Sequence, residues 1–113
     1  MKIGILGTEY DVEMRTRYED LRLENCDGYI DPTLKKIVVE AYDAAQDANP
    51  VMVVGDVQTD ERRATRHEIV HAFFYESGIY GNGGYGTDET LVDWIALQIP
   101  KMATAMREAG CLE

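Results

Sequence analysis

The sequence has few histidines, few cysteines and no long hydrophobic run. Its 113 residues include only two of each of these residue types. No apolar stretch approaches the ~20 residues that a membrane-spanning helix needs. The first seven residues are apolar but lack the features of a secretion signal, and the chain turns acidic at Glu9 and Asp11. We therefore expect a protein that does not enter a membrane, with the cytoplasm as its default location.

The two cysteines, Cys26 and Cys111, lie far apart in the sequence and fit no metal-ligand spacing. A disulfide is uncommon in a reducing compartment. We expect two free thiols.

Basic residues are also scarce, because 11 of them face 21 acidic ones and the net charge is −10. Proteins that bind nucleic acid or anionic membranes need basic surface to neutralise phosphate groups. This composition argues against both partners. A basic partner remains open, although an acidic surface more often serves solubility alone.

Length and composition predict one folded domain over residues 1–113. Hydrophobic residues make up 45% of the chain and charged residues 28%, which is typical of a folded protein. There is no internal repeat and no phosphate-binding glycine motif.

The N-terminal part predicts strands. Residues 2–7 form the first, which could continue past a break at Thr8 toward Met14. Gly28–Asp31 and residues 36–41 should pair as a hairpin, because Pro32-Thr33 between them favours a turn.

Residues 43–49 are polar and predict a loop or a short helical turn that Pro50 ends. The apolar run 51–54 is a further possible strand.

A helix should cover residues 60–77, with Thr59 or Asp60 as its N-cap and Gly78 at its end. Apolar residues occupy more than one of its faces, so we expect it to be buried between two layers. The glycine-rich segment 80–86 that follows predicts a flexible loop.

A second helix should begin after a cap at Thr87 or Asp88 and carry one apolar face. Pro100 should kink or interrupt it, and Gly110 should end it.

The first helix carries the most informative pattern, His67-Glu68-Ile69-Val70-His71, an HExxH run. Histidines four residues apart are neighbours on one helix face and can bind one Zn²⁺. The intervening Glu68 can then take a proton from a water on the metal. The alternative is two partly exposed helix histidines that flank a glutamate.

A hydrolytic zinc site needs a third protein ligand. The HExxHxxGxxH pattern does not supply it, because Phe74 and Ser77 occupy its glycine and histidine positions. Glu89 and Asp93 share a face of the second helix. We expect Glu89 to ligate zinc and Asp93 to accept a hydrogen bond from the other ring nitrogen of a ligand histidine. Alternatively, Glu89 is a favourable first-turn acid and Asp93 is solvated.

HExxH on one helix, followed by Glu89 and Asp93 on the next, resembles the gluzincin metallopeptidases. The small single-domain members, the minigluzincins and small phage- and Firmicute-associated metallopeptidases, are most similar. The resemblance implies an α+β, zincin-like fold. A small, mostly antiparallel sheet would lie above the active-site helix and the glutamate helix below it. It also implies that a peptide substrate aligns with an edge strand. Residues 36–41 or 51–54 are the candidates for that edge.

Larger gluzincins use a further histidine or a tyrosine to steady the oxyanion. No histidine remains here, so Tyr85, or Tyr80, could supply a phenol. Both can equally be ordinary loop aromatics. Large substrate-binding subdomains are missing, so recognition is either shallow or aided by a regulatory protein partner.

The sequence therefore predicts a zinc-dependent peptidase that acts on a peptide or protein substrate, with Glu68 as the general base. Two alternatives remain, a non-catalytic zinc-stabilised protein-binding module and, by family analogy alone, a phage-type regulator that clips a repressor.

Overall fold

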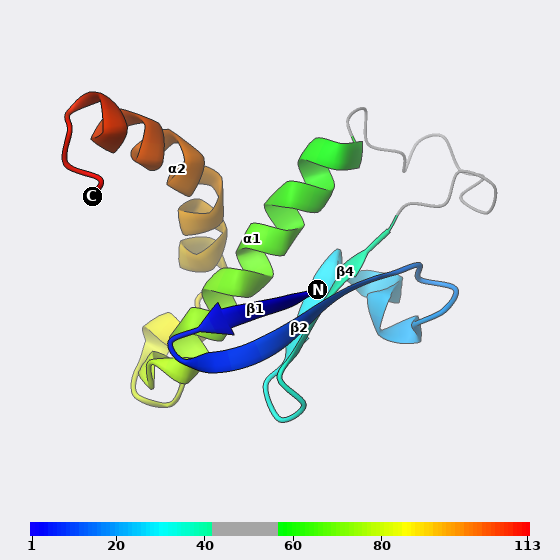
Figure 1. Cartoon of the computed structure of the whole chain (residues 1–113). Helices are drawn as coiled ribbons and strands as arrows, with labels where there is room; N and C mark the ends of the chain where they lie inside the picture. Colours follow the sequence, from blue (N-terminus) through cyan, green and yellow to red (C-terminus); the bar gives the residue numbers. More distant parts are fainter. Residues whose placement is uncertain (42–56) are drawn as a thin grey trace.

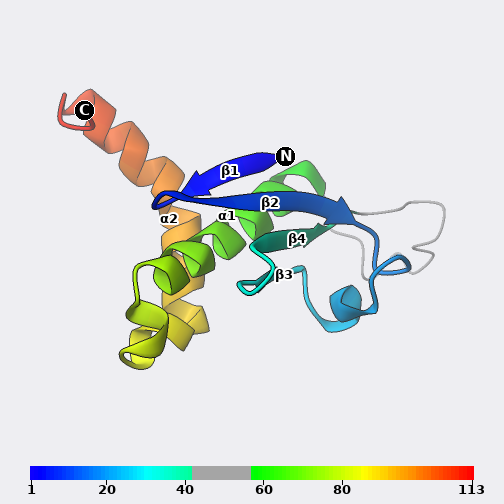
Figure 2. The same ribbon diagram turned by 60° about the horizontal axis from the view of Figure 1, so that its bottom comes forward.

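A computed structural model describes residues 1–41 and 57–113, without the side chain of Tyr85. A four-stranded sheet, the helix α1 (Val57–Glu76) and the helix α2 (Glu89–Glu108) form three layers, with α1 in the middle (Figures 1 and 2). The fold is α+β, as predicted. The possible strand at 51–54 and the loop at 43–49 fall outside the described residues.

The first predicted strand is two strands. β1 (Lys2–Ile5) and β2 (Thr8–Arg15) pair antiparallel across a tight turn at Leu6-Gly7. Both turn residues have positive φ, 48° and 86°, as the twist of a two-residue hairpin requires. The chain therefore reverses direction at Leu6-Gly7, directly before the break that was predicted at Thr8.

The hairpin predicted for Gly28–Asp31 and residues 36–41 is confirmed. β3 (Gly28–Asp31) and β4 (Lys36–Glu40) are antiparallel, with Asp31 opposite Lys36. Asp31 stabilises the turn, because its Oδ1 accepts from Thr33 Oγ1 at 2.7 Å and from the Leu34 N–H at 3.2 Å.

The two hairpins join through a parallel pairing of β2 with β4, which gives the strand order β1-β2-β4-β3. The sheet is therefore mixed, although two of its three pairings are antiparallel as expected. β4 is central, so the proposal that residues 36–41 form the edge is wrong. Among the described strands, β3 is the edge on that side.

α1 is buried on two sides, as its apolar pattern predicts. Ala64, Ile69 and Ala72 pack on the sheet core, whose large buried side chains are Ile5, Tyr10, Val12, Ile37 and Val39. The opposite side packs on α2. Alanines at the contact allow the helix to approach the sheet closely.

The ends of α1 agree in part with the prediction. Gly78 follows the helix with φ of 87°, the left-handed conformation that ends a helix. The predicted caps are wrong, because the helix begins at Val57 and Thr59 and Asp60 lie inside its first turn. Asp60 still favours that turn, since its negative charge lies at the positive end of the helix dipole.

The glycine-rich segment, for which the composition predicts a flexible loop, has local helical structure. It forms two short 3₁₀ turns, η3 (Ile79–Gly81) and η4 (Gly84–Thr87), packed against each other. Gly86 is buried at their contact. A Cβ atom there would lie 2.3 Å from the Cα of Tyr80.

α2 begins as predicted at the N-cap Asp88, whose Oδ1 accepts from the Leu91 N–H at 3.0 Å. Gly110, with φ of 71°, follows its end. Pro100 does not interrupt the helix. Proline lacks the N–H that would bind the carbonyl of Ala96. Arg66 of α1 donates to that carbonyl instead, from Nε at 2.7 Å, so the lost helix bond becomes a link between the helices.

Within the described parts of the chain, neither helix combines the length and apolar character needed to cross a membrane.

Gly86→Ala should destabilise the protein by about 1–3 kcal/mol, because the clash is with backbone atoms that cannot move aside. Gly84→Ala is the matched control, since its Cβ would meet nothing within 4 Å. Urea unfolding of both variants measures the difference. Equal midpoints would contradict the packing of η3 on η4.

Candidate metal centre

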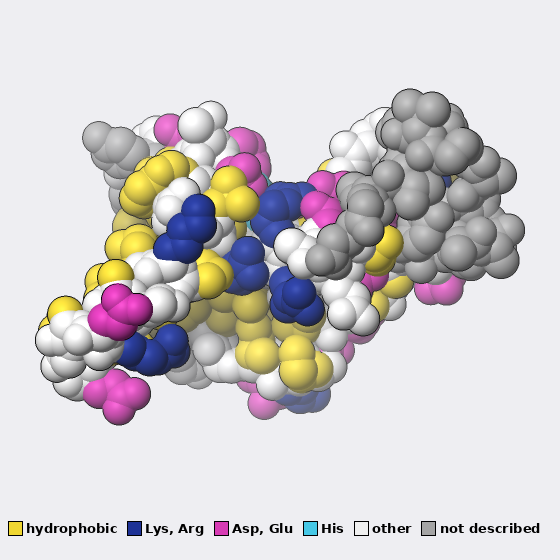
Figure 3. Space-filling model, turned by 90° about the horizontal axis from the view of Figure 1, so that it is seen from above, with side chains coloured by type: hydrophobic (Ala, Val, Ile, Leu, Met, Phe, Trp, Pro, Cys, Tyr) yellow, Lys and Arg dark blue, Asp and Glu magenta, His cyan; other side chains and the backbone are white. Residues whose placement is uncertain are grey.

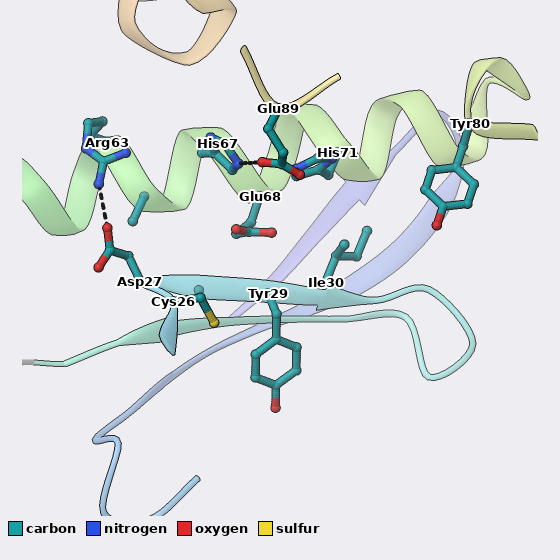
Figure 4. Close-up of a pocket in the computed structure, with 12 residues that line it drawn as sticks. Cys26, Asp27, Tyr29, Ile30, Arg63, His67, Glu68, His71, Tyr80 and Glu89 are labelled. Carbon is teal, nitrogen blue, oxygen red and sulfur yellow. Dashed lines mark hydrogen bonds and ion pairs between the residues drawn. The ribbon is translucent and has the colours of Figure 1, made fainter. Parts of the chain in front are cut away.

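His67 and His71 lie one turn apart on the side of α1 that faces the β3 edge and the start of α2 (Figure 4). Their ring centroids are 4.9 Å apart. Both rings are largely shielded, with 15% and 11% of the side chains exposed. Burial lowers the pKa of His71, and the nearby Glu89 carboxylate opposes that change. A low pKa keeps the imidazole neutral, the form that binds metal.

Glu89 brings a carboxylate to both histidines. Its Oε2 lies 2.9 Å from Nε2 of His67, and its Oε1 lies 2.9 Å from Nε2 of His71. The potential ligand atoms of the three residues are all within 4.8 Å of one another. Two imidazoles and one carboxylate are a donor set that catalytic zinc takes, with a position left open. The assignment of these residues as ligands fits this geometry and stays a prediction.

The local structure explains how Glu89 reaches the histidines. η3 and η4 turn the chain back after α1, and the Asp88 cap starts α2 at the next residue. Glu89 is therefore the first residue of α2, opposite the middle of α1. Its side chain is 69% exposed, so it lies at the mouth of the site.

Asp93 lies one turn further along α2, and its Oδ1 is 3.2 Å from Nδ1 of His67. A carboxylate there holds the Nδ1–H form of the ring and leaves the lone pair on Nε2. The sequence left open which histidine Asp93 would contact. In the structure it is His67.

Arg63 was missed by the sequence analysis. It contacts three carboxylates, with Nη1 at 3.3 Å from Asp93 and Nη2 at 2.9 Å from Asp27 and 3.1 Å from Asp60. Asp27 directly precedes β3, so Arg63 connects the sheet edge to the residue that orients His67. Its position four residues before His67 is the signal that could have identified it, because that spacing places both on one face.

Glu68 points from α1 toward β3 and is 6% exposed. Burial raises the pKa of its carboxyl to about 7; His67 lowers this pKa by a smaller amount, and the negative charges of Glu89 and Asp27 raise it further. Because Gly28 of β3 has no side chain, the Glu68 side chain can lie against this strand. A Cβ at Gly28 would lie 3.2 Å from Cγ of Glu68 and 2.9 Å from the carbonyl oxygen of Val38. A carboxyl with pKa near neutrality can both take and return a proton.

These residues surround a cleft of about 500 Å³ between α1 and the β3 edge. The segment from Cys26 to Ile30 forms one wall and α1 the other (Figure 4). Two contacts of Tyr29 stabilise this wall. Tyr29 donates a hydrogen bond to the buried Asp20, and the guanidinium of Arg22 stacks on the Tyr29 ring at 4.2 Å from its centroid.

Of the two tyrosines predicted as possible oxyanion ligands, the structure describes the side chain of Tyr80 and not that of Tyr85. Tyr80 lines the cleft and is 48% exposed, with its ring 5.6 Å from that of Tyr75. The backbone of Tyr85 lies in η4, and its side chain is outside the described residues. A role for Tyr85 at the oxyanion stays a prediction.

Both cysteines are free thiols, as predicted. Cys26, however, lines the cleft, which its spacing did not indicate. Its Sγ donates to the carbonyl of Arg22 at 3.1 Å, and burial raises the pKa of the thiol.

Comparisons of the chain with protein-family models, curated proteins and solved structures found no match. The resemblance to gluzincins consequently rests on the motif residues alone.

Glu68→Gln should change how stability depends on pH in the metal-free protein. The folded pKa of about 7 exceeds the ordinary 4.5, so the folded state binds the Glu68 proton more tightly than the unfolded state. This contribution is present below pH 4.5 and is lost as pH rises through 7. Between pH 5 and 8 the wild type should lose about 2 kcal/mol more stability than Glu68→Gln. Urea unfolding with a chelator measures this, and parallel pH curves would contradict it.

Proposed function

We propose that this protein is a zinc-dependent peptidase. One observation carries the proposal, namely that His67, His71 and Glu89 converge on a cleft that also buries the carboxyl of Glu68. Burial of an ionisable group is costly. Among the described residues no lysine or arginine lies within ion-pair distance of Glu68 to offset that cost. Such a group in a cleft, with a perturbed pKa, is typical of a catalytic acid or base.

The donor set fits zinc. His67, His71 and Glu89 would hold it, since nitrogen and carboxylate donors from three side chains match its catalytic sites. When bound, zinc would polarise the substrate carbonyl and lower the pKa of water.

The chain's own residues would perform the proton transfers. Glu68 accepts the proton of the attacking water and passes it to the leaving amine. Its position over Gly28 holds the carboxyl at the cleft wall. Asp93 keeps His67 in one tautomer and Arg63 keeps Asp93 in place.

The β3 edge would receive the substrate. β3 lines the cleft and pairs only with β4 among the described strands, so its other edge can bind an extended peptide through main-chain hydrogen bonds. This assigns to Gly28–Asp31 the edge that the sequence analysis sought in 36–41 or 51–54.

A zinc-stabilised module that binds protein without cleavage is the second candidate. One observation favours it. Glu89 joins α2 to two histidines of α1, so a metal at this point would crosslink the helices. This role requires the ligands and does not require Glu68.

Cleavage of a mixed library of quenched fluorescent peptides tests the proposal. The zinc-loaded wild type should cleave, and Glu68→Gln should be at least ~100-fold slower with zinc retained, because the general base is lost. Glu9→Gln, an exposed carboxylate on β2, is the control and should cleave normally. Cleavage by Glu68→Gln at the wild-type rate would refute the mechanism. Absence of cleavage, together with a large loss of stability in His71→Ala, would favour the module.

Asp93→Asn should weaken zinc binding by ~10–100-fold, because the amide no longer fixes the His67 ring as a carboxylate does. Asp60→Asn is the control. Asp60 contacts Arg63, as Asp93 does, but it forms no hydrogen bond with the ring of His67. Competition with a chromophoric chelator measures both affinities. Equal affinities would remove Asp93 from the site.

A further inference from the structure

The cleft carries more acidic than basic side chains. Among the described residues that line it, Arg63 is the one lysine or arginine, whereas Asp27, Glu68 and Glu89 are acidic. The carboxylates of Glu68 and Glu89 would balance the charge of a divalent metal at the histidines. Asp27 and Arg63 lie at one end of the cleft, beside this central group (Figure 4). The charge at that end therefore decides which ligands the cleft attracts.

That end is negative, although it contains an arginine. Arg63 contacts the carboxylates of Asp27, Asp60 and Asp93, so three negative charges face one positive charge. The Arg63 side chain is 26% exposed and that of Asp27 is 62% exposed. Asp27 binds Arg63 through Oδ2, and no described residue donates a hydrogen bond to its Oδ1. A ligand in the cleft therefore meets a carboxylate oxygen rather than the guanidinium. Figure 3 also shows acidic and basic side chains gathered together on one face of the molecule.

Glu68 gives an independent sign that this cleft receives a ligand. Its side chain is 6% exposed and points into the cleft, and no described residue donates a hydrogen bond to it. Buried polar groups in folded proteins normally have hydrogen-bond partners. A molecule that enters the cleft can supply the partner that the described residues do not.

β3 places Asp27 next to Glu68. Gly28 follows Asp27 in the chain, and a Cβ at Gly28 would lie 3.5 Å from Oε1 of Glu68. A peptide bound along β3 advances ~3.3 Å per residue. A side chain that reaches Asp27 therefore belongs to a residue within about two positions of the one that meets Glu68.

The opposite end of the cleft has a different character. Ile30 and Tyr80 line it, beyond His71 as seen from Arg63 (Figure 4). Neither of these side chains carries a charge at neutral pH. The attraction for positive charge is therefore confined to one side of the metal-binding residues.

We propose that the substrate is a peptide with a lysine or arginine on the Asp27 side of the cleaved bond. The proposal rests on the peptidase function, because it names the substrate of the same cleft. The cationic side chain binds Oδ1 of Asp27, where three carboxylates outweigh one arginine. The net charge of −10 also draws a cationic peptide toward the protein.

Peptide binding by the zinc-loaded Glu68→Gln protein tests the proposal separately from cleavage. The probes are labelled mixtures of short peptides whose residues are uncharged, except for a central lysine, glutamine or glutamate. Fluorescence anisotropy should show ~10-fold or tighter binding of the lysine mixture than of the glutamate mixture, because glutamate replaces attraction with repulsion. The preference should decrease in about 0.5 M salt, which screens the charges.

Asp27→Asn, added to Glu68→Gln, should lower the preference for lysine over glutamate at least ~3-fold, because it removes the charge that the lysine meets. Asp60→Asn is the matched control. It removes the same charge from the same arginine, but Asp60 does not line the cleft, so most of the preference should remain. Equal binding of the three mixtures, or an equal loss of preference in the two variants, would overturn the proposal.

Cleavage by the zinc-loaded wild type distinguishes this proposal from the peptidase function itself. Mass spectrometry of the products should show cuts within about two residues of the lysine and on one side of it. Cleavage that ignores the lysine would overturn the proposal and leave the peptidase function intact. Binding of the lysine mixture through Asp27 without any cleavage would refute the peptidase function and still support recognition of a cationic peptide.

Discussion

Burial of α1 on two sides is the constraint on which the rest of the structure depends. The sheet covers one side through Ala64 and Ala72, and α2 covers another. The histidines lie beside both contacts, and a Glu89 oxygen of α2 is 2.9 Å from each ring. Because both neighbours are packed, these side chains have little freedom, and a site that must hold a metal needs such rigidity. The bond from Arg66 to the carbonyl left free by Pro100 strengthens this arrangement one residue before His67. A residue that disfavours helices therefore contributes to fixing the helix pair.

The charges of the site form a chain that runs across the cleft. Asp27 on the sheet side, Arg63 on α1 and Asp93 on α2 are joined by ion pairs, and Asp93 also contacts His67. Each layer of the fold therefore contributes to the orientation of one histidine. Separate exposed ion pairs contribute little to stability. Their value here is positional, because Arg63 holds two carboxylates that would otherwise repel each other.

Local spacing determined what could be predicted from the sequence. The histidine pair and the β3–β4 hairpin depend on residues a few positions apart, and the sequence predicts both. The parallel pairing of β2 with β4 could not be foreseen, because it joins distant segments with no turn to fix their register. The two 3₁₀ turns of the glycine-rich segment meet where Gly86 lies against the backbone of Tyr80. Composition does not reveal such a contact. Arg63 was missed because two of its three partners, Asp27 and Asp93, lie in distant segments of the sequence.

The zinc content of the purified chain, measured by native mass spectrometry after zinc exposure and dialysis, tests the central claim most directly. One zinc per wild-type chain is expected, with a marked loss in Glu89→Ala, because that variant removes one of three ligands. Glu9→Ala is the matched control, since Glu9 has 68% of its side chain exposed against 69% for Glu89. Retention of one zinc in Glu9→Ala and its loss in Glu89→Ala would agree with the account. A wild type without zinc, or equal zinc in both variants, would contradict it.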